Sequence, residues 1–133
     1  MHLEVASGKF AVLAVVDDRE NFATSCPAID FLKECWPNYS STVKGYRALF
    51  DRYALGGRAS LTSALLHEVD KEDALFELIK GDLRIMCFFP GDGSVVLTNG
   101  VIKKGQKVDP LAVKECRRAK KKFMESRIVH VNR

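Results

Sequence analysis

Apolar residues occur in short runs along the chain, separated by glycine, proline and acidic residues. The run Phe10–Val16 (FAVLAVV) is continuous and rich in Val, which predicts a buried strand. Three further runs lie close together late in the sequence. They are Ala74–Ile79, Leu83–Phe89 and Ser94–Ile102. Because short turns at Lys80–Asp82 and Pro90–Gly93 separate them, we expect three antiparallel strands in a meander.

Apolar residues between these strands recur at helical spacing. A first helix is predicted over Pro27–Trp36, with Ser25 or Cys26 as its cap and Pro37 and Asn38 at its end. A second helix is predicted from Ser40 to Gly56–Gly57. Since a short turn joins them, the two should pack as an antiparallel pair. A last helix is predicted to begin at Pro110, with Asp109 as its cap.

The predicted element order is β-α-α-β-β-β-α in a single α+β domain over residues 1–133, with a core from about 10 to 124 and a tail over 125–133. The first strand has no neighbour in sequence, so it should join the meander. The helical pair should cover one face of an antiparallel sheet, giving a two-layer domain. Ser60–Asp73 is interpreted as a short helix or an irregular crossing. In the tail, Ile128, Val129 and Val131 are frayed or add an edge strand.

Charge is distributed unevenly. Residues 1–99 hold 10 Lys and Arg against 14 Asp and Glu, whereas residues 100–133 hold 11 against 3. A basic segment attracts acidic partners, of which a nucleic-acid backbone is the commonest and an acidic protein surface the second. The last helix is expected to have one apolar face and one basic face. Its apolar face holds Ala112, Cys116, Ala119 and Phe123, and its basic face holds Lys114, Arg117, Arg118 and Lys121.

Other features restrict the class of protein. The four cysteines lack CxxC spacing, so we interpret them as reduced thiols rather than disulfides or zinc ligands. No window reaches the roughly 20 apolar residues of a membrane span, and Asp17 and Asp18 directly follow the short N-terminal apolar run. We therefore expect a cytoplasmic protein without membrane contact. No P-loop, GxGxxG or metal-ligand spacing is present, so no cofactor is expected.

The order of elements and two motifs resemble the RelE/ParE toxin superfamily, above all its HigB-like, phage-derived branch. LFELIKGDLRIMCFF (Leu75–Phe89) is similar to that branch's acidic-basic-Gly-Leu-Arg-Ile pattern before an aromatic strand. VLTNGVIKKGQKVDP (Val96–Pro110) is similar to its strand followed by Gly, Lys-Lys, Gln, Lys and Pro. The resemblance spans about Phe10–Phe123. It implies a toxin of a toxin–antitoxin system that cuts mRNA, often on the ribosome, and that a cognate antitoxin, often of helix-turn-helix type, holds inactive.

Carried over residue by residue, the resemblance implies a catalytic set of Arg84, Lys103, Lys104 and Lys80. Metal-independent cleavage uses the RNA's own 2′-hydroxyl as nucleophile, and it needs cations at the phosphate and groups that move protons. In a meander the start of one strand lies beside the end of the next. Arg84 should therefore approach Ile102–Lys103, with Lys80 on the same edge. RNA contacts are expected from the basic residues after the meander, which are Lys107, Lys114, Arg117, Arg118 and Lys121.

Each assignment has a structural alternative. Arg84 could be an ion-pair partner of Glu77, Lys103–Lys104 a charged strand end and Lys80 an ordinary turn residue. His67 and His130 are interpreted as surface or structural residues rather than catalytic ones. Many relatives place a Tyr or His near the active edge, where this chain has Phe123. Three functions stay open: an mRNA endoribonuclease, a non-catalytic or gyrase-targeting binding protein of the same fold, and a phage-derived protein that has lost toxicity.

Overall fold

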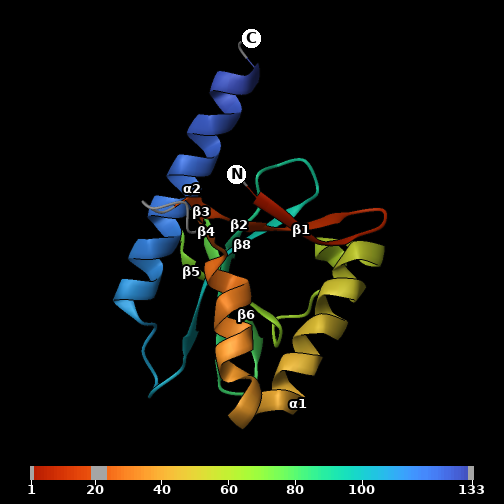
Figure 1. Cartoon of the computed structure of the whole chain (residues 1–133), viewed down its shortest axis with the longest axis vertical. Coiled ribbons are helices and arrows are strands. Elements are labelled where there is room, and N and C mark those ends of the chain that lie inside the picture. Colours follow the sequence, from red (N-terminus) through yellow and green to blue (C-terminus); the bar gives the residue numbers. More distant parts are fainter. Residues whose placement is uncertain (1, 19–23, 132–133) are drawn as a thin grey trace.

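A mixed six-stranded sheet with one helix on each face forms the body of the protein (Figure 1). The computed structural model describes residues 2–18 and 24–131, with side chains over 2–17 and 25–126. The sheet order is β1-β2-β8-β7-β6-β5. These strands are β1 (His2–Ser7), β2 (Ala11–Val15), β5 (Leu66–Asp70), β6 (Leu75–Lys80), β7 (Leu83–Phe88) and β8 (Val95–Ile102). The remaining elements are β3 (Asp17–Asp18), β4 (Thr24–Ser25), α1 (Pro27–Gly56), a 3-10 turn (Arg58–Ser60) and α2 (Pro110–Val131).

The predicted meander is confirmed, because β6, β7 and β8 pair antiparallel in sequence order. The first predicted strand also joins it, as expected, through β2. The expectation of an antiparallel sheet is wrong at this one pairing, where β2 runs parallel to β8 with Val12 opposite Val95. A parallel pair needs a long crossover connection, and the chain from α1 through β7 supplies it.

Two edge strands were not predicted. β1 pairs with β2, and β5 pairs with β6. Edge strands are partly solvated on both faces, so their apolar pattern is weak. β5 resolves the open interpretation of Ser60–Asp73, since part of that segment is a strand rather than a helix.

The predicted helical pair appears as the two arms of α1, which form a V in Figure 1. The helix is interrupted at Tyr39, where φ is −134° and ψ is 33°. Pro37 lies two residues earlier, and a proline inside a helix removes a hydrogen bond and clashes with the preceding turn. The sequence therefore located the break to within a few residues.

The sheet has a separate apolar core on each face. On the α1 side, Leu83, Ile85 and Cys87 of β7 pack with the inner residues of both α1 arms. On the other side, Met86 and Phe88 pack against α2. Because β7 alternates between the two cores, all of its residues are buried. The helical pair thus covers one face as expected, and the last helix covers part of the opposite one.

Helix α2 begins as predicted, with Asp109 Oδ1 accepting hydrogen bonds from the main-chain N–H groups of Leu111 (2.9 Å) and Ala112 (3.3 Å). The amide of Asn99 on β8 donates to the carbonyl of Ala112 (3.1 Å), which fixes the first turn of α2 on the sheet. Of the two alternatives left open for the tail, the edge strand is wrong, because the helix continues through Val131. As Figure 1 shows, its far end extends beyond the sheet.

The cysteines are free thiols as expected, and three of the four are buried. Among the described residues, no helix is long and apolar enough to span a membrane.

Candidate functional site: a basic pocket on the α2 face

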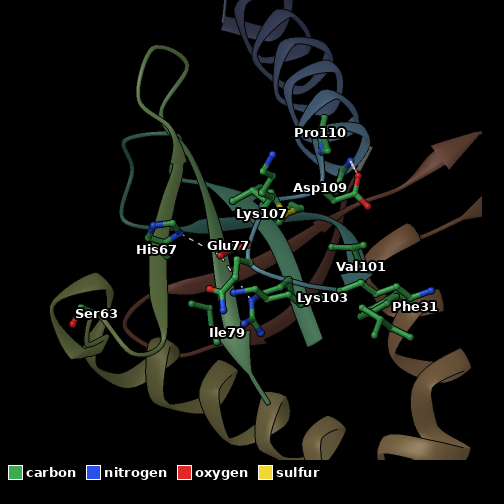
Figure 2. A pocket seen from close by; sticks show the side chains of 17 residues that line it. Phe31, Ser63, His67, Glu77, Ile79, Val101, Lys103, Lys107, Asp109 and Pro110 are labelled. Carbon is green, nitrogen blue, oxygen red and sulfur yellow. Dashed lines mark hydrogen bonds and ion pairs between the residues drawn. The ribbon is translucent and has the colours of Figure 1, made fainter. Parts of the chain in front are cut away.

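A pocket of about 870 Å³ opens on the α2 face of the sheet, between β5, β6, β7, the end of β8 and the loop before α2 (Figure 2). Its charged lining is mostly basic. The ionisable residues that line it are His67, Glu77, Arg84, Lys103, Lys104, Lys107 and Asp109. Four of the residues proposed from sequence, Arg84, Lys103, Lys104 and Lys107, thus line a common pocket.

Strand register brings these groups together. Arg84 lies opposite Ile79 on β6 and opposite Val101 on β8. Paired residues share a face of the sheet, so the Arg84 side chain lies on the pocket face. The main-chain N–H of Lys103 donates to the carbonyl of Asp82 (2.7 Å), which holds the end of β8 beside the β6–β7 turn. The predicted approach of Arg84 to the Ile102–Lys103 end of β8 is confirmed. Its partner is Val101, one residue before Ile102.

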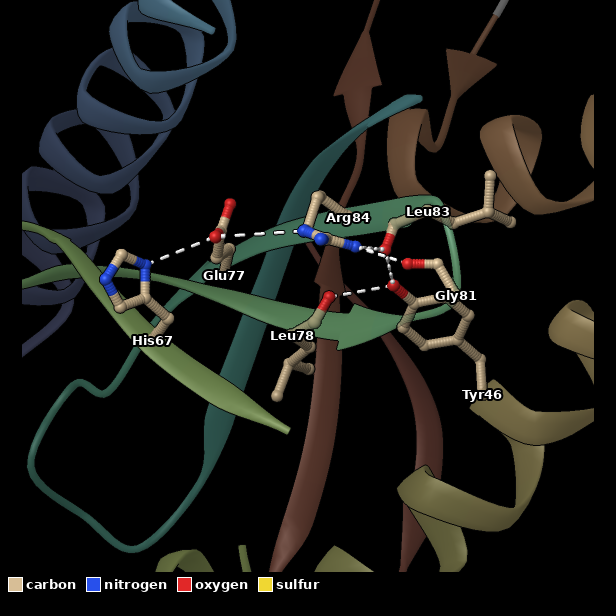
Figure 3. A network of polar contacts seen from close by, with 7 residues as sticks. All are labelled: Tyr46, His67, Glu77, Leu78, Gly81, Leu83 and Arg84. Atoms are coloured by element: carbon tan, nitrogen blue, oxygen red, sulfur yellow. Dashed lines mark hydrogen bonds and ion pairs between the residues drawn. The ribbon is translucent and has the colours of Figure 1, made fainter. Parts of the chain in front are cut away.

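The Arg84 side chain is buried, with a residue exposure of 8%. Its Nη1 donates to the carbonyls of Gly81 (2.7 Å) and Leu83 (2.9 Å), as Figure 3 shows. Its Nε lies 3.8 Å from Glu77 Oε1, too far for a hydrogen bond, and has no other hydrogen-bond acceptor. The alternative from sequence, an ion pair of Arg84 with Glu77, is therefore present in the structure.

Glu77 is also buried, with 6% exposure, and it has a second basic side chain beside it. The Nδ1 of His67 lies 3.2 Å from the same Oε1 atom (Figure 3). His67 comes from β5, directly opposite Glu77 in the strand register, and 57% of its side chain is exposed. Sequence reasoning missed His67 at this pocket because β5 was not predicted. With a strand at this position, the pairing of His67 with Glu77 follows from the register.

Lys80 is not brought to the pocket. Strand β6 alternates, so Phe76, Leu78 and Lys80 point toward α1, and Glu77 and Ile79 point toward the pocket. A Cβ built on Gly45 of α1 would lie 3.5 Å from the Lys80 Cδ, which confirms this direction. Lys80 lies at the same end of the hairpin as Arg84, as expected. The two side chains lie on opposite faces of the sheet, so Lys80 does not line the pocket with Arg84.

The residues expected to bind RNA from α2 are all exposed, but none of them lines the pocket. Arg117 pairs with two aspartates, through Nε with Asp73 (2.7 Å) and through Nη2 with Asp70. Arg118 lines a second hollow with Lys122, between α2 and the start of α1. Lys114 and Lys121 lie on the solvent side of the helix.

Phe123 is not an open stacking platform. Its ring packs at a steep angle against Phe88, with centroids 5.5 Å apart, and belongs to the core beneath α2. The aromatic residue in the pocket is instead Phe31, which packs directly on the main chain of β8 at Gly100. A Cβ at Gly100 would lie 2.1 Å from the Phe31 ring, so only glycine permits this approach.

The pocket combines exposed ammonium groups with an imidazole held by a buried carboxylate. Ammonium groups attract a phosphate, and an imidazole can accept or donate a proton near neutral pH. The arrangement therefore suits binding of a phosphodiester and proton transfer beside it. Comparison with known proteins found no family model and no curated protein that matches this chain.

Proposed function

We propose that this protein is a metal-independent endoribonuclease that acts on mRNA in the cytoplasm, as the toxin of a toxin–antitoxin system. One observation carries the proposal. Lys103, Lys104 and Lys107 line a single pocket with His67 and Glu77, although these residues come from distant parts of the sequence. The pocket thus offers both cations for a phosphodiester and a group that can move a proton.

The chemistry fits RNA because RNA carries its own nucleophile. The 2′-hydroxyl attacks the adjacent phosphorus, and the bond from phosphorus to the 5′-oxygen breaks. Ammonium groups at the pocket rim would balance the charge that develops on the phosphate oxygens. Lys103, Lys104 and Lys107 are exposed, so a strand of RNA can reach them.

The test is cleavage of mRNA by the purified protein, with and without ribosomes, followed by mapping of the new 5′ ends. The variant K103A/K104A should lose most of the activity. Matched removal of two cations from α1, in K44A/R52A, should leave activity unchanged, because both side chains are exposed on the helix that covers the opposite face. Intact transcripts under all conditions, together with normal growth on expression, would rule out the proposal.

The toxin part of the proposal implies a partner. A small antitoxin with an acidic surface would suit the basic pocket rim, since complementary charge steers association. Co-expression of the protein encoded beside it should restore growth if that protein is the antitoxin. Continued growth arrest would remove that neighbour as the partner.

A second function is favoured by the burial of Arg84. Its guanidinium donates to two main-chain carbonyls and lies beside Glu77, so it is committed to the protein rather than to a phosphate. A non-catalytic protein that occupies RNA or targets gyrase would need no free arginine there. Binding of RNA without cleavage would favour an RNA-binding protein, and a DNA-damage response on expression would favour gyrase as the target.

A further inference from the structure

Three residues from three adjacent strands form a line from the sheet interior to the pocket, as Figure 3 shows. Arg84 is the innermost, Glu77 lies between, and His67 reaches solvent. Both side chains approach the same carboxylate oxygen, with Arg84 Nε at 3.8 Å and His67 Nδ1 at 3.2 Å. The Glu77 carboxylate thus holds the exposed imidazole of His67 on one side. On its other side, the positive charge of Arg84 compensates its negative charge.

Burying a glutamate in a sheet is costly, and a buried ion pair is seldom more stabilising than apolar residues of similar size. Glu77 nevertheless occupies a position on β6 where only 6% of the residue is exposed. The position of Glu77 beside His67 gives a reason for its burial that stability alone does not give. A carboxylate beside Nδ1 favours the tautomer with the proton on Nδ1, which leaves a lone pair on Nε2.

We infer that His67 is the general base of the pocket, and that Glu77 and Arg84 are positioning residues for it. This inference rests on the proposed ribonuclease function. Nε2 of His67 takes the proton from the 2′-hydroxyl, and the 2′-oxygen forms a bond to phosphorus. The bond from phosphorus to the 5′-oxygen breaks, and that oxygen takes a proton from water. The products are a 2′,3′-cyclic phosphate and a free 5′-hydroxyl.

The other charged groups of the pocket fit this arrangement. Lys103, Lys104 and Lys107 line it from the loop after β8, and Asp109 is engaged in capping α2. The lysines therefore hold the phosphate near the imidazole, while Glu77 balances the charge that His67 gains when it accepts the proton.

The experiment compares H67Q with the unaltered protein on a short RNA, and measures binding separately with an RNA that carries 2′-deoxy sugars and cannot be cleaved. His67 is an exposed edge residue, so H67Q should fold normally, which circular dichroism checks. We expect cleavage to fall on the order of 100-fold or more, with unchanged affinity for the uncleavable RNA. In H67A, added imidazole should restore part of the lost rate.

A pH profile separates catalysis from a structural role. The pH dependence of cleavage by the unaltered protein should change in H67Q, because the variant lacks the group that accepts the proton. E77Q should change the profile as well, because it alters the group that holds the ring.

The outcomes separate the inference from the function on which it rests. If the unaltered protein cleaves RNA and H67Q cleaves at the same rate with the same profile, the inference is overturned and the function stands. If the unaltered protein binds RNA but never cleaves it, both are overturned.

Discussion

The β6–β7 hairpin has a buried polar network on each face, and the two networks differ in kind. On the α1 face, the hydroxyl of Tyr46 lies 2.7 Å from the Leu78 carbonyl and 2.8 Å from the Leu83 carbonyl. On the pocket face, Glu77 lies between Arg84 and His67. The first network is neutral and closed, whereas the second is charged and opens to solvent at His67.

The contrast separates polar groups that complete the core from polar groups that line the pocket. Burial raises the pKa of Tyr46 well above its usual range and that of Tyr53 to about 12, so both hydroxyls stay neutral under ordinary conditions. They satisfy main-chain carbonyls and complete the core. The charged network has a buried Nε without a hydrogen-bond acceptor and an imidazole that is more than half exposed. Such a network is poorly suited to stabilise a fold, which supports the catalytic role proposed above for the pocket.

The largest effect on stability should come from removing one charge of the buried pair. R84M leaves Glu77 as a buried carboxylate without its inner cation, and we expect the free energy of unfolding to fall by about 3–5 kcal/mol. Urea denaturation followed by circular dichroism measures this.

The double variant E77L/R84M sharpens the result, because it removes both charges and fills the space with apolar atoms. It should recover most of the stability that R84M loses, yet cleave RNA no better than H67Q. A double variant that is both stable and fully active would show that Glu77 and Arg84 have no part in the reaction.

A smaller effect is expected on the neutral side. Y46F removes a hydroxyl that serves two carbonyls, which should lower the free energy of unfolding by about 1–2 kcal/mol. The same urea experiment measures it, and RNA cleavage should be unchanged once the protein is folded. A loss of activity in folded Y46F would mean that the two faces of the hairpin are coupled.

The smallest effect on stability should come from the ion pairs of Arg117 with Asp70 and Asp73. These pairs lie at the surface, in contrast to the buried pair of Arg84 and Glu77. The Arg117 guanidinium lowers the pKa of Asp70. A carboxyl whose pKa is lowered by folding adds stability above its unfolded pKa of about 3.9, and this stability is lost as pH falls through the folded value. R117Q should therefore be slightly less stable than the unaltered protein at neutral pH and equal to it in acid.

Melting temperatures measured from pH 7 down to pH 2 test this prediction. R118Q is the matched control, since Arg118 is an exposed cation one residue away on the same helix. A constant difference between R117Q and the unaltered protein across the whole range would contradict a role for the Asp70 carboxylate.

The elements with strong apolar runs or proline signals were predictable from sequence. The meander, the starts of both helices at Pro27 and Pro110, and the break near Pro37 all follow from local chemistry. The edge strands β1 and β5 were missed because solvated strands carry little apolar signal. The parallel pairing of β2 was missed because it depends on contacts between distant segments.

The candidate site was likewise predictable from the sequence only in part. The meeting of Arg84 with the lysines after β8 follows from the meander, and the sequence indicated it. The position of Lys80 could have been corrected from the alternation of β6, in which Lys80 falls on the side of Phe76 and Leu78. The position of His67 in the pocket could not be predicted without β5, since that strand places the imidazole opposite Glu77.

The pairing of Val12 with Val95 also bears on how the molecule is made. A nascent chain leaving the ribosome exposes β2 early, but its partner β8 emerges only after α1 and the strands β5, β6 and β7. An interrupted translation product that ends before β8 thus lacks the centre of its sheet, and it also lacks the lysines that follow. Synthesis therefore has to proceed past β8 and the loop that follows it before the pocket can assemble.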